Sequence, residues 1–510
     1  MKLTDILHWD ARPGRLIEWR LHPATVASAD DAPEDSRPPA YIQESHVRTV
    51  QTLRQRGRHI PAWVGTAFDM PGQVDLDILE FTLQRWTRRH ETLCSGFQWV
   101  GDELRRFTLD PDTVRLQRDV VGEFPRAQDL CLYLQDRFDA ATDALSWPNF
   151  IYAAAVRDDS TSLYLAFDHT NVDAYSLQLM AAEIHDLYTA SVEGRPAEPP
   201  EIGSYVDFCE IERAQADQID ESHEIVARWR DFIVSCDGML PTFPLELGIV
   251  LGELPRQNLL QEMLVDGSDA AAFEAYCRVS GSSLAGILAA SSIAILEVGG
   301  CPTCRTVVPF HTRMRPQWSE SVGWYVGVVP IEIPTVQARD FWGVLEMARD
   351  ALRSSRLLAQ MPIARVLRLL GSDFRPASPD MFSLISYVDA RAVPGADRWA
   401  EWNASTLIRV SHGDQVCVWI TRIPEGLQLA CRYPDTDVAH KNMLRFVEEL
   451  RKIIISVART GGYGEYLREP DIRRSSSRVG QHVRGTGPRR EQGPVALTED
   501  GRDEPLSRHS

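Results

Sequence analysis

Three ionisable side chains lie close together in the segment LYLAFDHTNVDAYS (residues 163–176). Asp168 and His169 end an apolar run, and Asp173 follows four residues after the histidine. An imidazole with an unperturbed pKa of ~6.5 is mostly deprotonated at pH 7, so His169 is suited to act as a general base. A metal site is the alternative, but it usually needs three protein ligands and only two are obvious here. The residues alone therefore argue against a metal site and leave two interpretations of His169, a catalytic base or an ordinary surface histidine.

The residues around this cluster predict a strand that turns into a helix. In LYLAF (163–167) the side chains alternate with the period of a strand, and the following YSLQLMAAEIHDLY has helical spacing. A rigid scaffold can hold polar side chains out of the core at such a connection, which is why connections often carry function.

Other segments with a clear period predict further helices. DLDILEFTLQRWTRRHETL (75–93) places apolar residues on one helix face, with acidic residues at its start. LAGILAASSIAIL (284–296) predicts a buried helix with Ser282 or Ser283 near its N-cap, and its 13 residues are too few to span a bilayer. HKNMLRFVEELRKIIISVA (440–458) predicts a closing helix.

The second half also contains strand patterns. We expect strands in TLIRVSH, QVCVWITRI and LQLACRY, with turns at Gly413-Asp414 and at Pro424-Glu425-Gly426. Together with the helices, these patterns predict a mixed α/β fold.

The composition limits the classes of function. The 510 residues are 44% hydrophobic and 25% charged, as in ordinary soluble proteins. A net charge of -18 argues against general nucleic-acid binding, which needs a basic surface. The first residues, MKLTDILHWDARPG, do not form a basic and then apolar signal sequence, so we expect a cytoplasmic protein without a membrane span.

Cysteines give no sign of a disulfide framework or a metal site. The chain has 9 cysteines, an odd number without a repeated spacing. Cys301 and Cys304 have the C-x-x-C form, but a redox or zinc role needs a helix start, a second pair or nearby histidines. We predict that this pair is structural.

Changes in composition divide the chain. We predict a first lobe at 1–190 that carries the His169 cluster, a linker at 191–204 rich in proline and glycine, and a second lobe at 205–465. Residues 466–510 are rich in Arg, Gly and Ser and have few large apolar side chains, so we expect a disordered tail.

Three stretches together resemble the condensation-domain superfamily of carrier-protein-dependent acyltransferases. DHTNVDA resembles that superfamily's active-site motif of two histidines, three variable residues, aspartate and glycine. RRHETLCSGF (88–97) resembles its early helix end, and VVPFHTRMRPQWSESVGWYVGVVPIEIP (307–334) resembles its second-half strand and loop. LHWDARPGRLIEWRLHP, RPPAYIQESHVR and PDTDVAHKNMLRFVEEL further resemble the polyketide-associated acyltransferases, notably the mycobacterial group that acylates trehalose. The resemblance covers about residues 1–465.

Two residues depart from the active-site motif. Asp168 stands in place of the first histidine, and Ala174 stands in place of the glycine. The family that this motif resembles tolerates variation at the first position, so Asp168 does not exclude catalysis. Ala174 keeps a backbone N–H but adds a methyl group where an acyl or pantetheine chain would pass, which bears on substrate shape.

The resemblance implies a fold and a reaction. The fold would be two chloramphenicol-acetyltransferase-like lobes with mixed sheets, arranged as a V-shaped pseudo-dimer with a tunnel between them. His169 would activate a hydroxyl acceptor, a sugar or another natural-product alcohol, which would attack an acyl thioester. The donor would be an acyl carrier protein with its phosphopantetheine, or acyl-CoA, with no further cofactor. The enzyme would work as a monomer.

The resemblance also assigns roles to other residues. Asp173 would be structural and pair with Arg313, and the backbone N–H near Ala174 would hold the oxyanion. Four residues would line the tunnel or pack in the core beside it, and these are His311, Trp324, Tyr325 and Ser386.

Two other functions remain open from the sequence. The same fold could form an amide, as in nonribosomal peptide synthesis. A catalytically inactive condensation-like domain could instead serve as a recruitment module, which the missing first histidine favours and the retained His169, Asp173 and Arg313 oppose.

Overall fold

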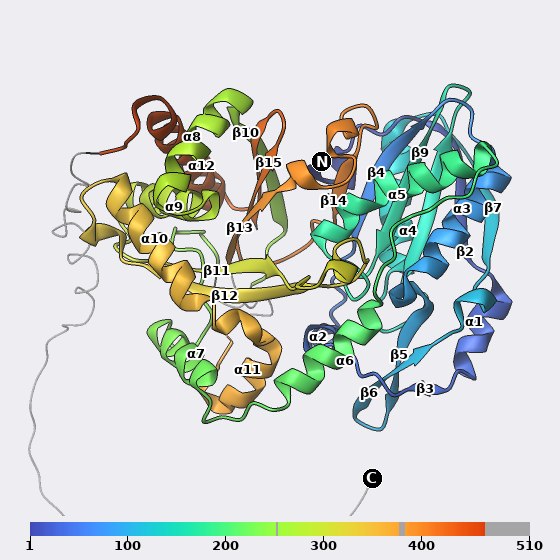
Figure 1. Cartoon of the computed structure of the whole chain (residues 1–510), viewed down its shortest axis with the longest axis horizontal. Helices are drawn as coiled ribbons and strands as arrows, with labels where there is room; N and C mark the ends of the chain where they lie inside the picture. The colour runs from blue at the N-terminus through green and yellow to red at the C-terminus, as the bar shows by residue number, and fades with distance from the viewer. Residues whose placement is uncertain (251–252, 377–382, 465–510) are drawn as a thin grey trace, which may run out of the picture. The chain divides into compact units, whose positions relative to one another are not determined.

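The computed structural model describes residues 1–250, 253–376 and 383–464 (Figure 1). The tail expected to be disordered, 466–510, lies outside the described residues. Residues Met1–Leu467 form one compact unit, which contains both predicted lobes.

A seven-stranded sheet forms the centre of the first half, in the order β1-β14-β4-β9-β8-β2-β7. Its strands are β1 (Lys2–Asp5), β14 (Ser405–Ile408), β4 (Val64–Pro71), β9 (Ser160–Phe167), β8 (Phe150–Val156), β2 (Gly14–Leu21) and β7 (Leu116–Phe124). β9 is the strand predicted before His169, and it lies between β4 and β8 with antiparallel partners on both sides.

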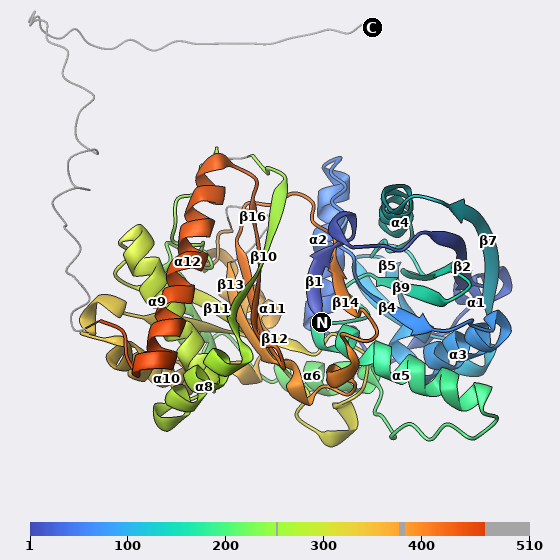
Figure 2. The same cartoon turned by 90° about the horizontal axis from the view of Figure 1, so that it is seen from above.

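Both faces of this sheet are covered. The helices α3 (Leu76–Arg89) and α5 (Ala174–Val192) cover one face, and α4 (Ala127–Ala141) covers the other (Figure 2). All residues of β9 are therefore buried. This double burial explains why residues 163–167 are apolar on both faces, because a strand with one solvated face would need polar residues at alternate positions.

The strand β14 connects the two halves. It follows most of the second half in the chain, yet it lies between β1 and β4 in the first sheet. The residues before it, including Trp399 and Trp402, belong to the apolar core under the first sheet. The expected turn at Gly413-Asp414 is therefore not a hairpin, because β14 and β15 lie in different sheets.

The second half is built on a six-stranded sheet in the order β10-β16-β15-β13-β11-β12. Its strands are β10 (Gln257–Asp266), β16 (Gly426–Pro434), β15 (Cys417–Ile423), β13 (Leu384–Asp389), β11 (Cys304–His311) and β12 (Val326–Ile333). The core of this half includes α8 (Gly267–Ser280), α9 (Ser283–Gly299), α10 (Phe341–Ser355) and α12 (Asp437–Thr460) (Figure 1). α9 matches the predicted buried helix, and Ser282 is its N-cap.

The remaining elements surround these sheets. A small sheet pairs β6 (Glu103–Thr108) with β3 (Glu34–Asp35) and β5 (Ser95–Val100). The remaining helices are α1 (Pro23–Asp30), α2 (Tyr41–Gln55), α6 (Tyr205–Ala216), α7 (Glu224–Ser235) and α11 (Ile363–Leu370). The predicted linker 191–204 runs from the last turn of α5 to the residue before α6.

Within the residues described, no single helix is both long enough and apolar enough to cross a membrane. The segments Gly267–Val279 and Ser283–Gly299 meet the length and composition only as a pair, and they are bent by 101°.

Gly65 in β4 tests the packing of the first sheet. A Cβ at this residue would lie against the main-chain carbonyl oxygen of Leu165 in β9, well inside van der Waals contact. We expect Gly65→Ala to lower the free energy of unfolding by about 1–3 kcal/mol, as overpacked sites do. Gly462→Ala is the control, because a Cβ there meets nothing within 4 Å. Equal thermal melting of both variants would contradict this account.

Candidate active site

The predicted cluster lies in the connection between β9 and α5. β9 ends at Phe167 and α5 begins at Ala174, so Asp168, His169 and Asp173 occupy the loop between them. Asp173 is the N-cap of α5, and its Oδ1 accepts a hydrogen bond of 2.7 Å from the backbone N–H of Ser176. The end of a buried strand and the start of a buried helix therefore fix both ends of the loop.

Asp173 forms a buried bidentate ion pair with Arg313, which follows β11. Arg313 Nη1 donates to Oδ2 at 2.6 Å and Nη2 donates to Oδ1 at 3.0 Å. The two side chains are 3% and 2% exposed. Burial raises the pKa of Asp173, but the charge and hydrogen bonds of Arg313 outweigh burial and leave this pKa below its ordinary value.

The segment 321–325 of the second half packs against the Asp173–Arg313 ion pair. The Ser176 hydroxyl donates to the Gly323 carbonyl at 2.9 Å, and the backbone N–H of Tyr325 donates to Asp173 Oδ2 at 3.0 Å. Arg313 also lies over the Tyr325 ring, 4.3 Å from its centroid. A Cβ at residue 323 would collide with the Tyr205 ring, so this close approach requires glycine.

The RRHETL stretch, at the end of α3, contacts both α5 and the segment 321–325. His90 Nε2 lies 2.9 Å from Glu183 of α5, and Arg89 Nε donates to the same carboxylate at 2.6 Å. Burial raises the pKa of Glu183, but His90 and Arg89 lower it to about 2. The other ring nitrogen of His90 accepts from the Val322 N–H at 3.4 Å. The motif thus joins α3 and α5 to the segment from the second half.

His169 is partly exposed, unlike the residues around it. Its ring stacks on the indole of Trp324, with 4.1 Å between centroids and 27° between planes. Within the described part of the chain, its Nδ1 is buried and has no hydrogen-bond partner. Burial lowers the pKa of His169, and the nearby His46 lowers it further. The imidazole is therefore held neutral near pH 7.

The helix α2 adds two residues that the sequence analysis did not single out. His46 Nε2 lies 3.0 Å from Asp168 Oδ2, and Gln43 Nε2 donates to the Thr170 carbonyl at 2.7 Å. Both occur in the quoted stretch RPPAYIQESHVR, three positions apart on one helix face. Polar residues at that spacing on a buried helix face were the available signal, but their partner loop lies over a hundred residues further along the chain.

The other predicted site residues have different surroundings. Ala174 is exposed at the first turn of α5, and His311 is exposed at the end of β11. Tyr325 is 0% exposed and donates from its hydroxyl to Ser321 Oγ, so it packs in the core and does not line an open passage. Ser386 is buried in β13 opposite Trp419 of β15.

The described residues contain no group of three or more His, Cys, Asp or Glu side chains that could hold a metal ion. All nine cysteines are free thiols, and Cys301 Sγ donates to the Thr303 carbonyl at 3.2 Å. Cys301 and Cys304 therefore form no disulfide in this structure.

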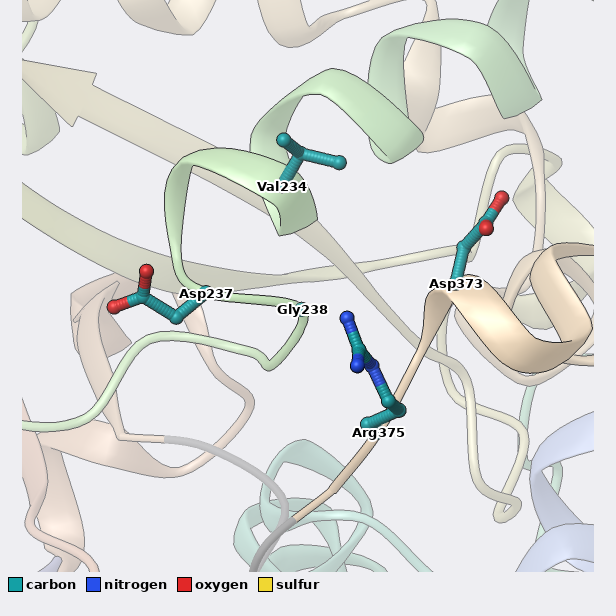
Figure 3. A pocket seen from close by; sticks show the side chains of 5 residues that line it. All are labelled: Val234, Asp237, Gly238, Asp373 and Arg375. Carbon is teal, nitrogen blue, oxygen red and sulfur yellow. The ribbon is translucent and has the colours of Figure 1, made fainter. Parts of the chain in front are cut away.

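A surface depression of about 300 Å³ lies at the end of α7 (Figure 3). It is lined by Val234, Asp237, Gly238, Asp373 and Arg375. None of these residues belongs to the loop that carries His169, so the depression is separate from the site described above.

Comparison with known proteins decides the family. The condensation domain family model matches residues 42–388, which is more than half of the chain. The chain belongs to the condensation-domain family. The match begins at α2 and ends in β13, so it includes His46, His169 and Arg313.

Curated relatives match most of this condensation-domain protein. Acyltransferase PapA3 of Mycobacterium tuberculosis is 27% identical over 461 residues, which covers 89% of this chain and 96% of the relative. Trehalose-2-sulfate acyltransferase PapA2 of Mycobacterium bovis is 28% identical over 466 residues, which covers 89% and 97%. A solved structure of PapA2 acyl transferase has a TM-score of 0.83 at 27% identity and covers 90% of this chain and 100% of that chain. The protein is an acyltransferase of this family.

Replacement of Arg313 tests the buried ion pair. We expect Arg313→Ala to lower the free energy of unfolding by about 3–5 kcal/mol, because Asp173 stays buried without its cation. Paired Asp173 has a lowered pKa and stabilises the fold above pH 3.8, its ordinary pKa, whereas unpaired Asp173 destabilises it there. The difference between the two proteins should therefore shrink as the pH falls toward and below 3.8.

The control for this experiment is Arg126→Ala. Arg126 also forms a two-point pair with a carboxylate, Asp129, but its side chain is 77% exposed. Such surface pairs contribute little to stability because water screens their charges. Urea unfolding curves over a range of pH measure both variants, and an Arg313→Ala protein as stable as the wild type would rule out the pair as a structural anchor.

Proposed function

We propose that the enzyme transfers an acyl group from a thioester to a hydroxyl group of a sugar or a related alcohol, with His169 as the general base. The observation that carries this proposal is a partly exposed imidazole whose loop is held by two buried pairs, Asp173 with Arg313 and Asp168 with His46. Burial lowers the pKa of this imidazole, which favours its neutral form. The relative PapA2 is named a trehalose-2-sulfate acyltransferase, which supports a sugar acceptor.

The reaction needs one proton carrier. His169 takes the proton of the acceptor hydroxyl, and the oxygen attacks the carbonyl carbon of the thioester. The tetrahedral intermediate then breaks its C–S bond, and the imidazolium returns the proton to the departing sulfur, which gives an ester and a free thiol. A positioned base of this kind contributes roughly 10²–10⁴-fold to the rate.

The environment of His169 suits this role. A lowered pKa keeps the ring mostly unprotonated at pH 6.5, the ordinary pKa of histidine, and above. The face of Trp324, 4.1 Å from the ring centroid, would stabilise the imidazolium that forms during the reaction. The low pKa also makes that imidazolium a good acid toward the leaving thiol.

The oxyanion has a candidate site at the start of α5. The first N–H groups of a helix have no partner within the helix and carry partial positive charge. Ala174 is exposed at this position, five residues after His169, so its N–H is our choice of donor. Acyl-CoA and a carrier protein's phosphopantetheine present the same thioester, and either would be a substrate of this site.

The test uses purified protein with octanoyl-CoA or palmitoyl-CoA and either trehalose or trehalose 2-sulfate. We expect an ester product by mass spectrometry and a loss of roughly 10²-fold or more in His169→Ala, because the group that takes the proton is removed. The control is His8→Ala, which removes an exposed histidine. Full turnover by folded His169→Ala would rule out the proposed base.

A second assay separates ester from amide formation. Amino sugars and amino-acid amides replace the alcohols under the same conditions. Amide products without esters would assign the protein to amide-forming condensation. If a full series of acyl-CoA and acyl-carrier donors gives no turnover, the proposal fails in favour of a recruitment module.

A further inference from the structure

The helix α2 holds the His169 loop at two points, one on each side of the catalytic residue. His46 contacts Asp168, and Gln43 donates to the carbonyl of Thr170. Arg106 of β6 donates to Gln43 Oε1 at 2.9 Å, which leaves the amide nitrogen of Gln43 to face the loop. The residues before and after His169 are therefore both bound to the same rigid helix.

The contact of His46 with Asp168 has the geometry of a charged pair. The Asp168 side chain is 5% exposed, and the His46 side chain is 18% exposed. The other oxygen of Asp168 accepts from the backbone N–H of Thr170 at 2.9 Å. Burial alone would lower the pKa of His46 and raise that of Asp168, but their mutual attraction reverses both directions.

Trp324 joins this pair to the catalytic ring. Its indole stacks on His169 and meets His46 edge-on, with 5.6 Å between the His46 and Trp324 centroids. Trp324 is itself held by its carbonyl, which accepts from the Tyr205 hydroxyl at 3.0 Å. A shift of His46 would therefore reach His169 by two routes, through Asp168 in the chain and through the shared indole.

We propose that His46 is a positioning residue for acyl transfer, because its imidazolium pairs with Asp168 and holds the loop and ring of His169 in place. The proposal rests on His169 as the base of the proposed function. It gives Asp168 a role at the position where the family motif has a histidine. The imidazole that contacts Asp168 belongs to His46 of α2, which is 122 residues away in the chain.

Besides burial, the charged groups that shift the pKa of His169 are His46 of α2 and Asp168 and Asp173 of its own loop. Arg313, after β11, pairs with Asp173, and His311 at the end of β11 interacts with both of them. Asp173 is neutralised by Arg313, and Asp168 is neutralised by His46. Loss of His46 leaves Asp168 as the unbalanced charge, and a negative charge near an imidazole favours its protonated form.

Stability alone is a weak reason for a buried charged pair. Such pairs contribute little to stability compared with apolar side chains of similar size, because both charges lose their hydration. A pair that orients a neighbouring group has a use that packing does not supply. The measurement that separates the two roles is a pH profile with and without the charge of Asp168, because only an electrostatic effect is reversed when that charge is removed.

The kinetic experiment compares His46→Gln with the wild type for the acyl-CoA and acceptor on which the wild type turns over. Gln keeps a hydrogen-bond donor for Asp168 but carries no charge. We expect the acid limb of the kcat/KM profile to move up by roughly one pH unit, because the lone Asp168 stabilises protonated His169. In the double variant with Asp168→Asn, the limb should return part of the way.

Two controls accompany this profile. His59→Gln removes an exposed histidine that lies soon after α2, and its profile should match the wild type. Thermal melting of His46→Gln separates loss of fold from loss of position. A folded His46→Gln with an unmoved acid limb overturns the proposal.

A second readout needs no activity. Titration of isotope-labelled histidine rings by NMR should show His46 above pH 6.5 in the wild type and below pH 6.5 in Asp168→Asn, where burial acts alone. Equal titration in both proteins overturns the charged pair. Wild-type protein without turnover would instead contradict the proposed function, and the NMR result would still decide whether the pair exists.

Discussion

The ion pair between Asp173 and Arg313 is the interaction on which the rest of the site depends. Its two residues are 140 positions apart, and both side chains are almost fully buried. A buried carboxylate without its cation is strongly unfavourable, so the His169 loop reaches its observed form only when the second half of the chain is in place. Asp173 also caps α5, which couples the start of that helix to the same pair.

The site distributes its charges so that one group stays neutral. Asp173 is paired with Arg313, Asp168 with His46, and Glu183 with His90 and Arg89. His169 lies among these pairs and takes part in none of them, and burial favours its uncharged form. A neutral ring held beside fixed charges can accept a proton without rearrangement of the protein, which is the basis of electrostatic preorganisation.

The strand β14 comes from the second half of the chain but pairs in the first sheet, so the two halves share a sheet as well as a site. This strand pairs with β1 and β4, while β15 and β16, which follow it directly, pair in the second sheet. The segments 321–325 and 390–408 thus both cross from the second half into the first half. Docking of the halves is therefore fixed by main-chain hydrogen bonds at β14 and by buried side chains near His169.

The sequence by itself determined the local elements and the place of His169 between two of them. Periodicity placed β9, α3, α5, α9 and α12, since the burial that shapes these segments repeats along the chain. It also placed His169 at a strand-to-helix connection, and the family motifs pointed to Arg313. Only the tertiary structure brought His46 and Gln43 to the loop, buried Tyr325 and moved β14 into the first sheet. These contacts join residues far apart in the chain, and neither hydrophobic period nor turn chemistry carries information about a partner at such a distance.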